Sequence, residues 1–174
     1  MAISVDLIKE LRHMTSASVA HCKKALEDTG GDLKKAAEFL RKHGLEIAAK
    51  KQARAAKEGR VEAYVHLGNK IGVLLEVNCE SDFVARNPDF CQFTKDLCMH
   101  IAACNPSYLK KEDVPGEIID QEKNKDEYYK AHCLMEQPFV KDPAITINDY
   151  LGTIVSKLGE NIFVRRFMRY KIGE

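Results

Sequence analysis

The spacing of apolar residues changes at residue 60, and this change limits the folds that the chain can adopt. Before it, apolar side chains recur every three or four positions, as in helices, and after it they alternate with other residues, as in strands. Helical spacing returns after residue 88, and NIFVRRFMRYKI at 161–172 has the β-branched and aromatic residues of a last strand. Helices, a hairpin, further helices and a strand in this order predict an α+β fold, with a small antiparallel sheet packed by helices.

Two alternating runs, at 61–67 and 71–79, predict the hairpin itself. Gly68-Asn69 lies between them and is typical of a two-residue turn. We expect one face of each strand to be buried against the helices. The residues expected on the buried face are Val61, Ala63, Val65 and Leu67 in the first strand and Ile71, Val73, Leu75, Val77 and Cys79 in the second.

Residues 1–45 predict an N-terminal module of three short helices. Ser4, Ser18 and Asp32 each precede a run with helical spacing and can cap it. Glycines at 30–31 can end the second helix, and Gly44 can end the third. Helices of about ten residues bury only a small core, which favours a compact recognition module over an enzyme.

The segment 46–59 is rich in alanine and lysine and lacks a wide apolar stripe, so we expect a helical linker that leads to a core domain at 60–174. Residues 46–60 contain five basic residues and two acids, so RNA binding is one interpretation of this segment. No aromatic residue is interleaved with these basic residues, which favours a solvated helix face. A second basic group, on the last strand, is divided between two faces by alternation. It consists of Arg165, Arg166, Arg169 and Lys171.

The segment after Asn87-Pro88 predicts the central helix of the core, which runs to Asn105. Asn87 can cap this helix, and Pro88 suits its first position. A second core helix can be capped by Thr146 and ended by Gly159. The apolar residues expected to pack along the central helix are Phe90, Phe93, Leu97 and Ile101.

The charge balance excludes a general attraction for polyanions. Lysine and arginine total 27 and the acids total 26, which leaves a net charge of +1. The longest apolar run is too short to cross a membrane, and helical spacing begins at once, leaving no room for a signal segment. We therefore expect a cytoplasmic protein that binds neither nucleic acid nor a membrane directly.

The reactive side chains do not form a catalytic or metal-binding pattern. Six cysteines are spread along the chain without a CxxC pair, so we expect reduced thiols that mostly fill the core. One interpretation is a zinc site formed by Cys91, Cys98, His100 and Cys104. However, Cys91 and Cys98 share a helix face with core residues, which favours packing in the core. No GxxxxGK[ST], GxGxxG, HExxH or GxSxG motif occurs. The sequence therefore predicts no enzyme, no metal and no cofactor.

The segment ESDFV at 80–84 lies between the predicted hairpin and the central helix. Asp82 could cap a helix, and Phe83 could pack as a hydrophobic staple onto the helix that follows. Both are ordinary structural roles, and the residue pattern by itself favours them.

The longest of four ordered stretches, AYVHLGNKIGVLLEVNCESDFVAR at 63–86, gives this segment a second interpretation. The others are CKKAL with GDLKKAAEFLRKHGL between 22 and 45, EQPFVKDP at 136–143 and LGENIFVRRF at 158–167. Together they resemble bacterial translation elongation factor Ts, whose Thr-Asp-Phe-Val is matched by Ser81, Asp82, Phe83 and Val84. Four matches in order over nearly the whole chain are improbable by chance.

The resemblance implies a guanine-nucleotide exchange factor for elongation factor Tu, the GTPase of the elongation step in protein synthesis. It implies that Ser81, Asp82, Phe83 and Val84 bind this GTPase and dislocate its magnesium ion, which promotes GDP release. It also implies that the N-terminal module has a ubiquitin-associated-like fold, in agreement with the three helices predicted from the residues.

Further implications of the resemblance concern the N-terminal module and the oligomeric state. Arg12 matches an arginine of the family that contacts the partner, and Val19 is a further expected contact. The segment from Thr15 to Ala20 departs from the family's Thr-Gly-x-Gly turn and the apolar pair that follows it. The chain has room for one core, like the short forms of the family, which act as homodimers. The alternative function is an RNA- or ribosome-binding protein without exchange activity.

Overall fold

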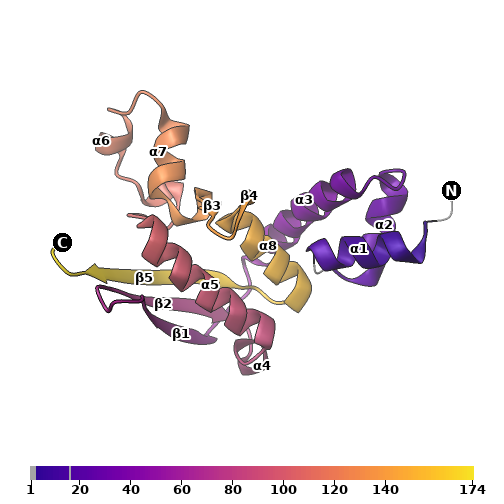
Figure 1. Cartoon of the computed structure of the whole chain (residues 1–174), viewed down its shortest axis with the longest axis horizontal. Coiled ribbons are helices and arrows are strands. Elements are labelled where there is room, and N and C mark those ends of the chain that lie inside the picture. Colours follow the sequence, from indigo (N-terminus) through magenta and orange to yellow (C-terminus); the bar gives the residue numbers. More distant parts are fainter. Residues whose placement is uncertain (1–2, 16) are drawn as a thin grey trace.

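The computed structural model describes residues 3–15 and 17–174, and over these residues the protein has the expected α+β fold (Figure 1). The N-terminal helices are α1 (Val5–Thr15), α2 (Val19–Asp28) and α3 (Leu33–Lys51). The hairpin and the segments that follow it are β1 (Glu58–Val65), β2 (Ile71–Cys79), α4 (Asp82–Ala85) and α5 (Pro88–Cys104). The remaining α-helices and strands are α6 (Gly116–Ile119), α7 (Lys125–His132), β3 (Pro138–Phe139), β4 (Asp142–Thr146), α8 (Ile147–Leu158) and β5 (Phe163–Lys171).

The helices of the N-terminal module begin where the sequence predicts. Ser4, Ser18 and Asp32 each accept a backbone N–H from the first turn of the helix that follows. The three helices enclose a small core of their own, separate from the main core. Its buried members are Leu11, Cys22, Ala25, Leu26 and Ala36.

The predicted end of the third helix at Gly44 is wrong, because α3 continues to Lys51. Gly44 instead allows α3 to approach α8: a Cβ at this position would lie 3.1 Å from the carbonyl oxygen of Gly152. Helix is observed over only the first part of the expected linker at 46–59, and β1 begins at Glu58. The division into three segments stays a prediction, since α3 belongs to the N-terminal module and also packs along the core.

The three long strands form one antiparallel sheet in the order β1-β2-β5. The expected hairpin connects β1 and β2, and Val65 pairs with Gly72 beside the turn. The strand register is centred on Gly68-Asn69, as expected, but the loop is longer than two residues. The N–H of His66 donates to the carbonyl of Ile71, and the N–H of Asn69 donates to the carbonyl of His66, each at 2.9 Å. Gly68 has φ of +88°, a value that glycine adopts at little cost.

The expected buried face of β1 is wrong. Val61 and Val65 are 61% and 63% exposed, whereas Val73, Leu75, Val77 and Cys79 of β2 are buried as expected. Strand pairing explains the difference, because Val61 lies opposite Glu76 and the partner of Leu75 is Glu62. Residues that pair directly share a face of the sheet, so β1 presents Glu62 and Tyr64 to the helices and its valines to solvent.

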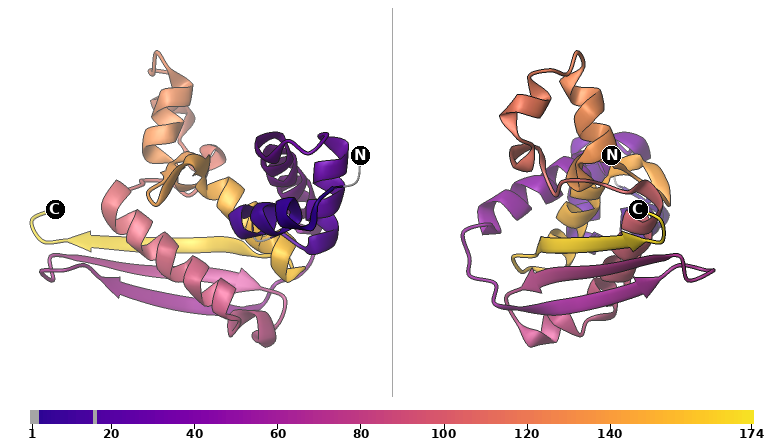
Figure 2. Two further views of the ribbon diagram at one scale, coloured as in Figure 1. Left: turned by 45° about the vertical axis from the view of Figure 1, so that its right-hand side comes forward. Right: turned by 90° about the vertical axis from the view of Figure 1, so that its left-hand side faces the viewer.

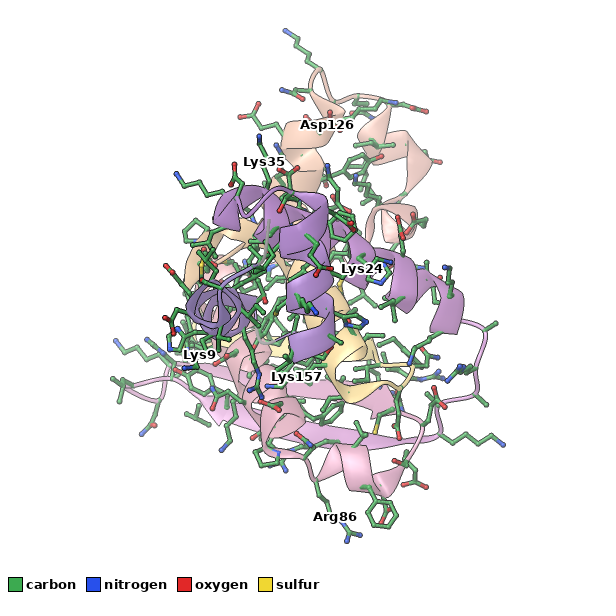
Figure 3. All side chains as sticks on the ribbon, turned by 90° about the vertical axis from the view of Figure 1, so that its right-hand side faces the viewer. Lys9, Lys24, Lys35, Arg86, Asp126 and Lys157 are labelled. Carbon is green, nitrogen blue, oxygen red and sulfur yellow. The ribbon has the colours of Figure 1, made fainter. Side chains whose placement is uncertain are left out.

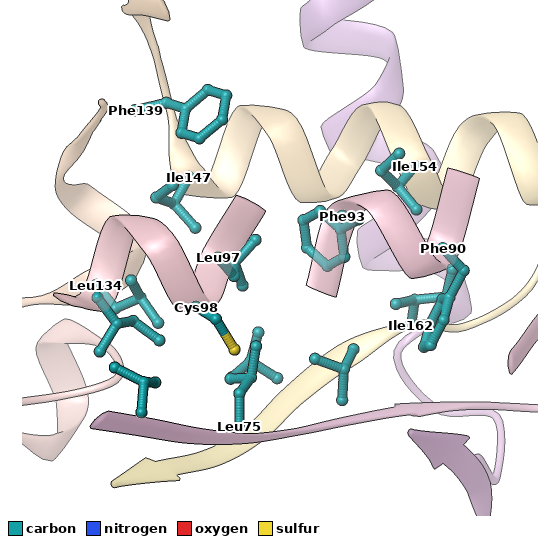
Figure 4. Packing of buried hydrophobic residues seen from close by; sticks show 14 of the residues in the cluster. Leu75, Phe90, Phe93, Leu97, Cys98, Leu134, Phe139, Ile147, Ile154 and Ile162 are labelled. Atoms are coloured by element: carbon teal, nitrogen blue, oxygen red, sulfur yellow. The ribbon is translucent and has the colours of Figure 1, made fainter. Parts of the chain in front are cut away.

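The main core lies between the sheet and two helices, α5 and α8 (Figures 2 and 4). Asn87 caps α5 and Pro88 occupies its first turn, as predicted. Thr146 caps α8 in a capping box with Asp149, and Gly159 ends that helix in the left-handed conformation. The fully buried apolar side chains on α5 are Phe90, Phe93, Leu97, Cys98 and Ile101, and they meet Leu75 and Val77 of the sheet and Ile147 and Val155 of α8.

His100 of α5 is fully buried and fixes the segment around β3 and β4. Its Nδ1 accepts the N–H of Val140 at 3.3 Å, so Nε2 carries the proton and donates to Oε1 of Gln137 at 2.9 Å. Burial lowers the pKa of His100, which keeps the ring in the neutral form that these two contacts require. The imidazole is therefore a structural member of the core.

The cysteines are free thiols, and four of the six are buried, in agreement with their expected place in the core. Within residues 3–15 and 17–174, no three side chains of the metal-ligating types come together to hold an ion. The helices described in these ranges include none that is long and apolar enough to span a bilayer.

Candidate functional site

The segment at 80–84 forms a corner between β2 and α5, and the single turn of α4 lies within it. Ser81 caps this turn by accepting the N–H of Val84 at 3.4 Å, so the expected capping role of Asp82 is wrong. Phe83 is 83% exposed and does not pack as a staple, so the second structural role is wrong as well. In Figure 3, α4 lies at one end of the molecule, and Arg86 after it points away from the body of the protein.

The two faces of α4 differ in what they contact. Val84 is half-buried and packs against the main core together with Ala85. Asp82 and Phe83 face outward, and Asp82 forms an exposed ion pair with Arg86 at 2.9 Å. Exposed pairs of this kind contribute little to stability, so the carboxylate of Asp82 remains available to another molecule. We call Asp82 and Phe83 together the tip.

A carboxylate from a distant part of the chain holds the start of α4. Glu160 lies in the loop between α8 and β5, and its Oε2 accepts the backbone N–H groups of Glu80 and Ser81, each at 3.0 Å. Its Oε1 accepts the hydroxyl of Ser81 at 2.5 Å. Hydrogen bonds to an ionised acceptor are stronger than neutral ones, so this carboxylate fixes the backbone directly before the tip.

Two further contacts tie the same corner to the rest of the fold. Glu80 accepts the backbone N–H of Asn161 at 2.6 Å, so the segments at 80–81 and 160–161 hold each other reciprocally. The buried thiol of Cys79 donates to the carbonyl of Ser81 at 3.1 Å. Burial, followed by the nearby charge of Glu160, raises the pKa of Cys79 to about 11, which keeps this thiol protonated and able to donate at neutral pH.

The other predicted contact residues lie on the N-terminal module. Arg12, in the last turn of α1, and Val19, at the start of α2, are both exposed and flank the connection between these helices. Ser16, in the segment that departs from the family pattern, lies outside the described residues. The predicted site residues therefore form two groups on different parts of the molecule, one at α4 and one between α1 and α2 (Figure 1).

Five of the nine basic residues that suggested RNA binding form ion pairs with acids. On β5, Arg166 pairs with Glu76 at 2.7 Å, and Arg169 and Lys171 both pair with Glu174. The side chain of Arg169 is mostly buried and also donates to the carbonyl of Ala102. Arg54, which follows α3, pairs with Glu80, and Arg60 of β1 pairs with Glu62. These pairings reduce the positive potential that a phosphate backbone would meet.

Known proteins are similar to this chain over both the N-terminal helices and the segment that carries the tip. The family model described as "Elongation factor TS" matches residues 3–127, a range that contains α1 to α3, the hairpin and the tip. The chain is 46% identical to elongation factor Ts of Caldanaerobacter subterraneus over an alignment of 195 positions, gaps included, which covers 99% of this chain and 98% of that protein. The chain belongs to the elongation factor Ts family. Elongation factor Ts of Geobacter sulfurreducens and that of Thermodesulfovibrio yellowstonii are also 46% identical and cover 100% of this chain and 91% and 98% of their own lengths.

Two structural features of this family member were not predicted from its sequence. The first is Glu160, which lies in the stretch LGENIFVRRF that carries part of the resemblance, but whose contact with Ser81 crosses 79 positions of the chain. The second is the exposed apolar face of the sheet. The hairpin register could have revealed this face. Val65 pairs with Gly72 and therefore shares its side of the sheet, whereas Ile71, one residue before Gly72, points to the opposite side.

Proposed function

We propose that this protein is a guanine-nucleotide exchange factor for elongation factor Tu and promotes release of GDP during the elongation step of protein synthesis. Membership of the elongation factor Ts family implies this activity. The observation that supports the mechanism is the tip, where a phenylalanine that is 83% exposed is carried by an ordered turn. Large exposed apolar side chains in fixed positions are typical anchors of protein interfaces.

In the proposed mechanism, the tip inserts between elements of the GTPase that hold its magnesium ion. Phe83 supplies the buried apolar contact, and Asp82 supplies a charge beside it. Ser81 and Val84 hold the turn in position, one as its cap and the other through the core. Magnesium requires near-ideal octahedral geometry, so a small displacement of its ligands weakens the hold on the GDP phosphates. The protein forms no covalent bond in this scheme and requires no cofactor of its own.

Arg12 and Val19 are proposed as a second contact with the same GTPase. Both are exposed beside the connection between α1 and α2, and neither is needed for the small core of that module. Because translation elongation takes place in the cytoplasm, we propose that location for the protein. Direct binding of nucleic acid or of a membrane is not part of the proposal.

The proposal predicts a complex that excess GDP dissociates. Binding of the exchange factor and binding of nucleotide oppose each other, and thermodynamic linkage makes the opposition reciprocal. We expect the tagged protein to retain nucleotide-free elongation factor Tu on an affinity column and to release it when GDP is added. Retention that depends on RNA and is lost after nuclease treatment would favour the alternative function instead.

We also propose that two copies pair through the outer face of the sheet. The register aligns Ala63 with Leu74 and Leu74 with Met168 across the three strands. This face is mainly apolar, with one ion pair between Glu76 and Arg166 beside Val61, and it is free of helices within the described residues (Figure 2). A two-fold pairing would cover the same patch on each copy. Its exposed members are Val61, Val65, Leu74, Met168 and Tyr170.

Leu74→Lys is expected to convert the dimer to a monomer, because it removes an apolar contact and brings two like charges together at the centre of the interface. Loss of one buried leucine contact of about 1.5 to 3 kcal/mol corresponds to a dissociation constant raised at least about tenfold. Sedimentation at several concentrations measures the change. Val5→Lys, at an exposed valine of α1, serves as the control. A Leu74→Lys protein that dimerises as tightly as the original would exclude this face.

A further inference from the structure

The geometry points to Glu160 as the positioning residue of the tip. This inference rests on the proposed exchange function, and it assigns a role to a side chain that lies outside the tip itself. Glu160 does not need to touch the GTPase in order to act. It fixes the backbone that carries Asp82 and Phe83, so that the aromatic ring is presented in one orientation before the partner arrives.

The contacts of Glu160 converge on the two residues directly before the tip. Three donors, the N–H of Glu80, the N–H of Ser81 and the hydroxyl of Ser81, point at its two carboxylate oxygens. The same hydroxyl oxygen of Ser81 accepts the N–H of Val84, so the carboxylate and the cap of α4 share one side chain. Removal of Glu160 leaves the Ser81 hydroxyl free to rotate and two backbone N–H groups without their acceptor.

The loop that carries Glu160 is itself anchored to the end of α3. The side-chain amide of Asn161, which is buried, donates to the carbonyl of Arg54 at 2.7 Å, and Arg54 pairs with Glu80 at 3.5 Å. Lys51 donates to the carbonyl of Gly159 at the end of α8. The segment after α3, the end of α8 and the base of the tip therefore meet in one hydrogen-bonded cluster, with Glu160 on the side of the tip.

Preorganisation explains why such a contact influences exchange. A tip that samples several orientations loses conformational freedom when it enters the GTPase, and this loss reduces the binding energy left to displace the magnesium ligands. A small displacement of Phe83 from its binding position would lower the exchange rate for the same reason. The energetic role of Glu160 is to make the tip rigid in the free protein.

The first test measures rigidity without any partner. Hydrogen exchange of the free Glu160→Ala protein is expected to be faster over residues 80–84 and unchanged in α5. Glu136→Ala is the matched control, because Glu136 is also a half-buried glutamate but lies outside this cluster, where it pairs with Lys111 at 3.1 Å. Equal protection of residues 80–84 in the original and Glu160→Ala proteins would overturn the inference.

The second test is a double-mutant cycle on GDP release from elongation factor Tu. Glu160→Ala is expected to slow the stimulated release roughly tenfold, and Glu160→Gln, which retains one acceptor oxygen, roughly threefold. If Glu160 acts through the tip, adding Glu160→Ala to Phe83→Ala causes a much smaller loss than Glu160→Ala does alone, because only Asp82 remains to be positioned. A purely structural role would instead give additive losses, and additivity would overturn the inference.

The outcomes separate this inference from the proposed function. If Phe83→Ala slows release and Glu160→Ala and Glu160→Gln do not, the exchange function stands and the role of Glu160 is wrong. If Phe83→Ala has no effect on release, the proposed mechanism itself is wrong, whatever the result for Glu160. Should Glu160→Ala not fold, as judged by circular dichroism, Glu160→Gln provides the same comparison, because it has nearly the same shape.

Discussion

Replacing Phe83 with alanine is expected to slow the GDP release that this protein stimulates from elongation factor Tu by at least about tenfold. Full burial of a phenylalanine in a partner is worth roughly 1.5 to 3 kcal/mol, and each 1.4 kcal/mol is a factor of about ten. The fold should not change, because the ring is exposed and makes no contribution to either core. Displacement of fluorescent GDP at a factor concentration below saturation measures the effect.

Leu67→Ala provides the control for this experiment. Leu67 lies in the hairpin turn and is 91% exposed, so it is another large apolar side chain whose removal costs the fold little. We expect Leu67→Ala to stimulate release at the original rate and Asp82→Ala to reduce it less than Phe83→Ala does. Unchanged release with Phe83→Ala, in a protein with its original melting temperature, would show that the tip is not the anchor.

Gly44→Leu is expected to lower the free energy of unfolding by about 2 kcal/mol, as is typical when a side chain is forced into a filled space. The Cβ would lie 3.1 Å from the oxygen and 3.2 Å from the carbon of the Gly152 carbonyl, which are backbone atoms that cannot rotate away. Helix propensity alone predicts the opposite sign, because replacing a glycine inside a helix normally stabilises it by up to about 1 kcal/mol. Urea denaturation decides between the two effects.

The control for Gly44→Leu is Gly116→Ala in the first turn of α6. No atom lies within 4 Å of a Cβ at Gly116, so the added methyl group meets open space and the free energy of unfolding should remain the same or rise slightly. If Gly44→Leu is as stable as the original protein, the close approach of α3 and α8 does not hold in solution.

Local signals in the sequence predict the helix starts well. The caps at Ser18, Asp32, Asn87 and Thr146 are all confirmed, because a cap depends on a side chain and an N–H only two or three residues away. The end of α3 is predicted wrongly for a related reason. Gly44 has the residue type of a helix end, but its role depends on Gly152, which is distant in the sequence.

The face of the sheet and the anchoring of the tip also depend on tertiary structure. Both faces of β1 carry residues that suit a strand, so alternation alone does not identify the buried one, and pairing with Glu76 decides that Val61 faces solvent. The exposed tip was expected from the family resemblance rather than from the pattern. Its anchor, Glu160, lies 79 positions from Ser81, and no local pattern reports a contact over that separation.

The uninterrupted course of α3 from Leu33 to Lys51 has a consequence for how sequences of this type can vary. One inserted residue in an α-helix advances everything beyond it by about 1.5 Å and turns it by about 100°. An insertion between Ala36 and Gly44 would therefore swing Arg12 and Val19 around the helix axis, while the tip stayed in its place. Substitutions along the exposed side of α3 leave the geometry intact. Even an insertion of seven residues, which nearly restores the original angle, would move the module along the helix axis by about 10.5 Å.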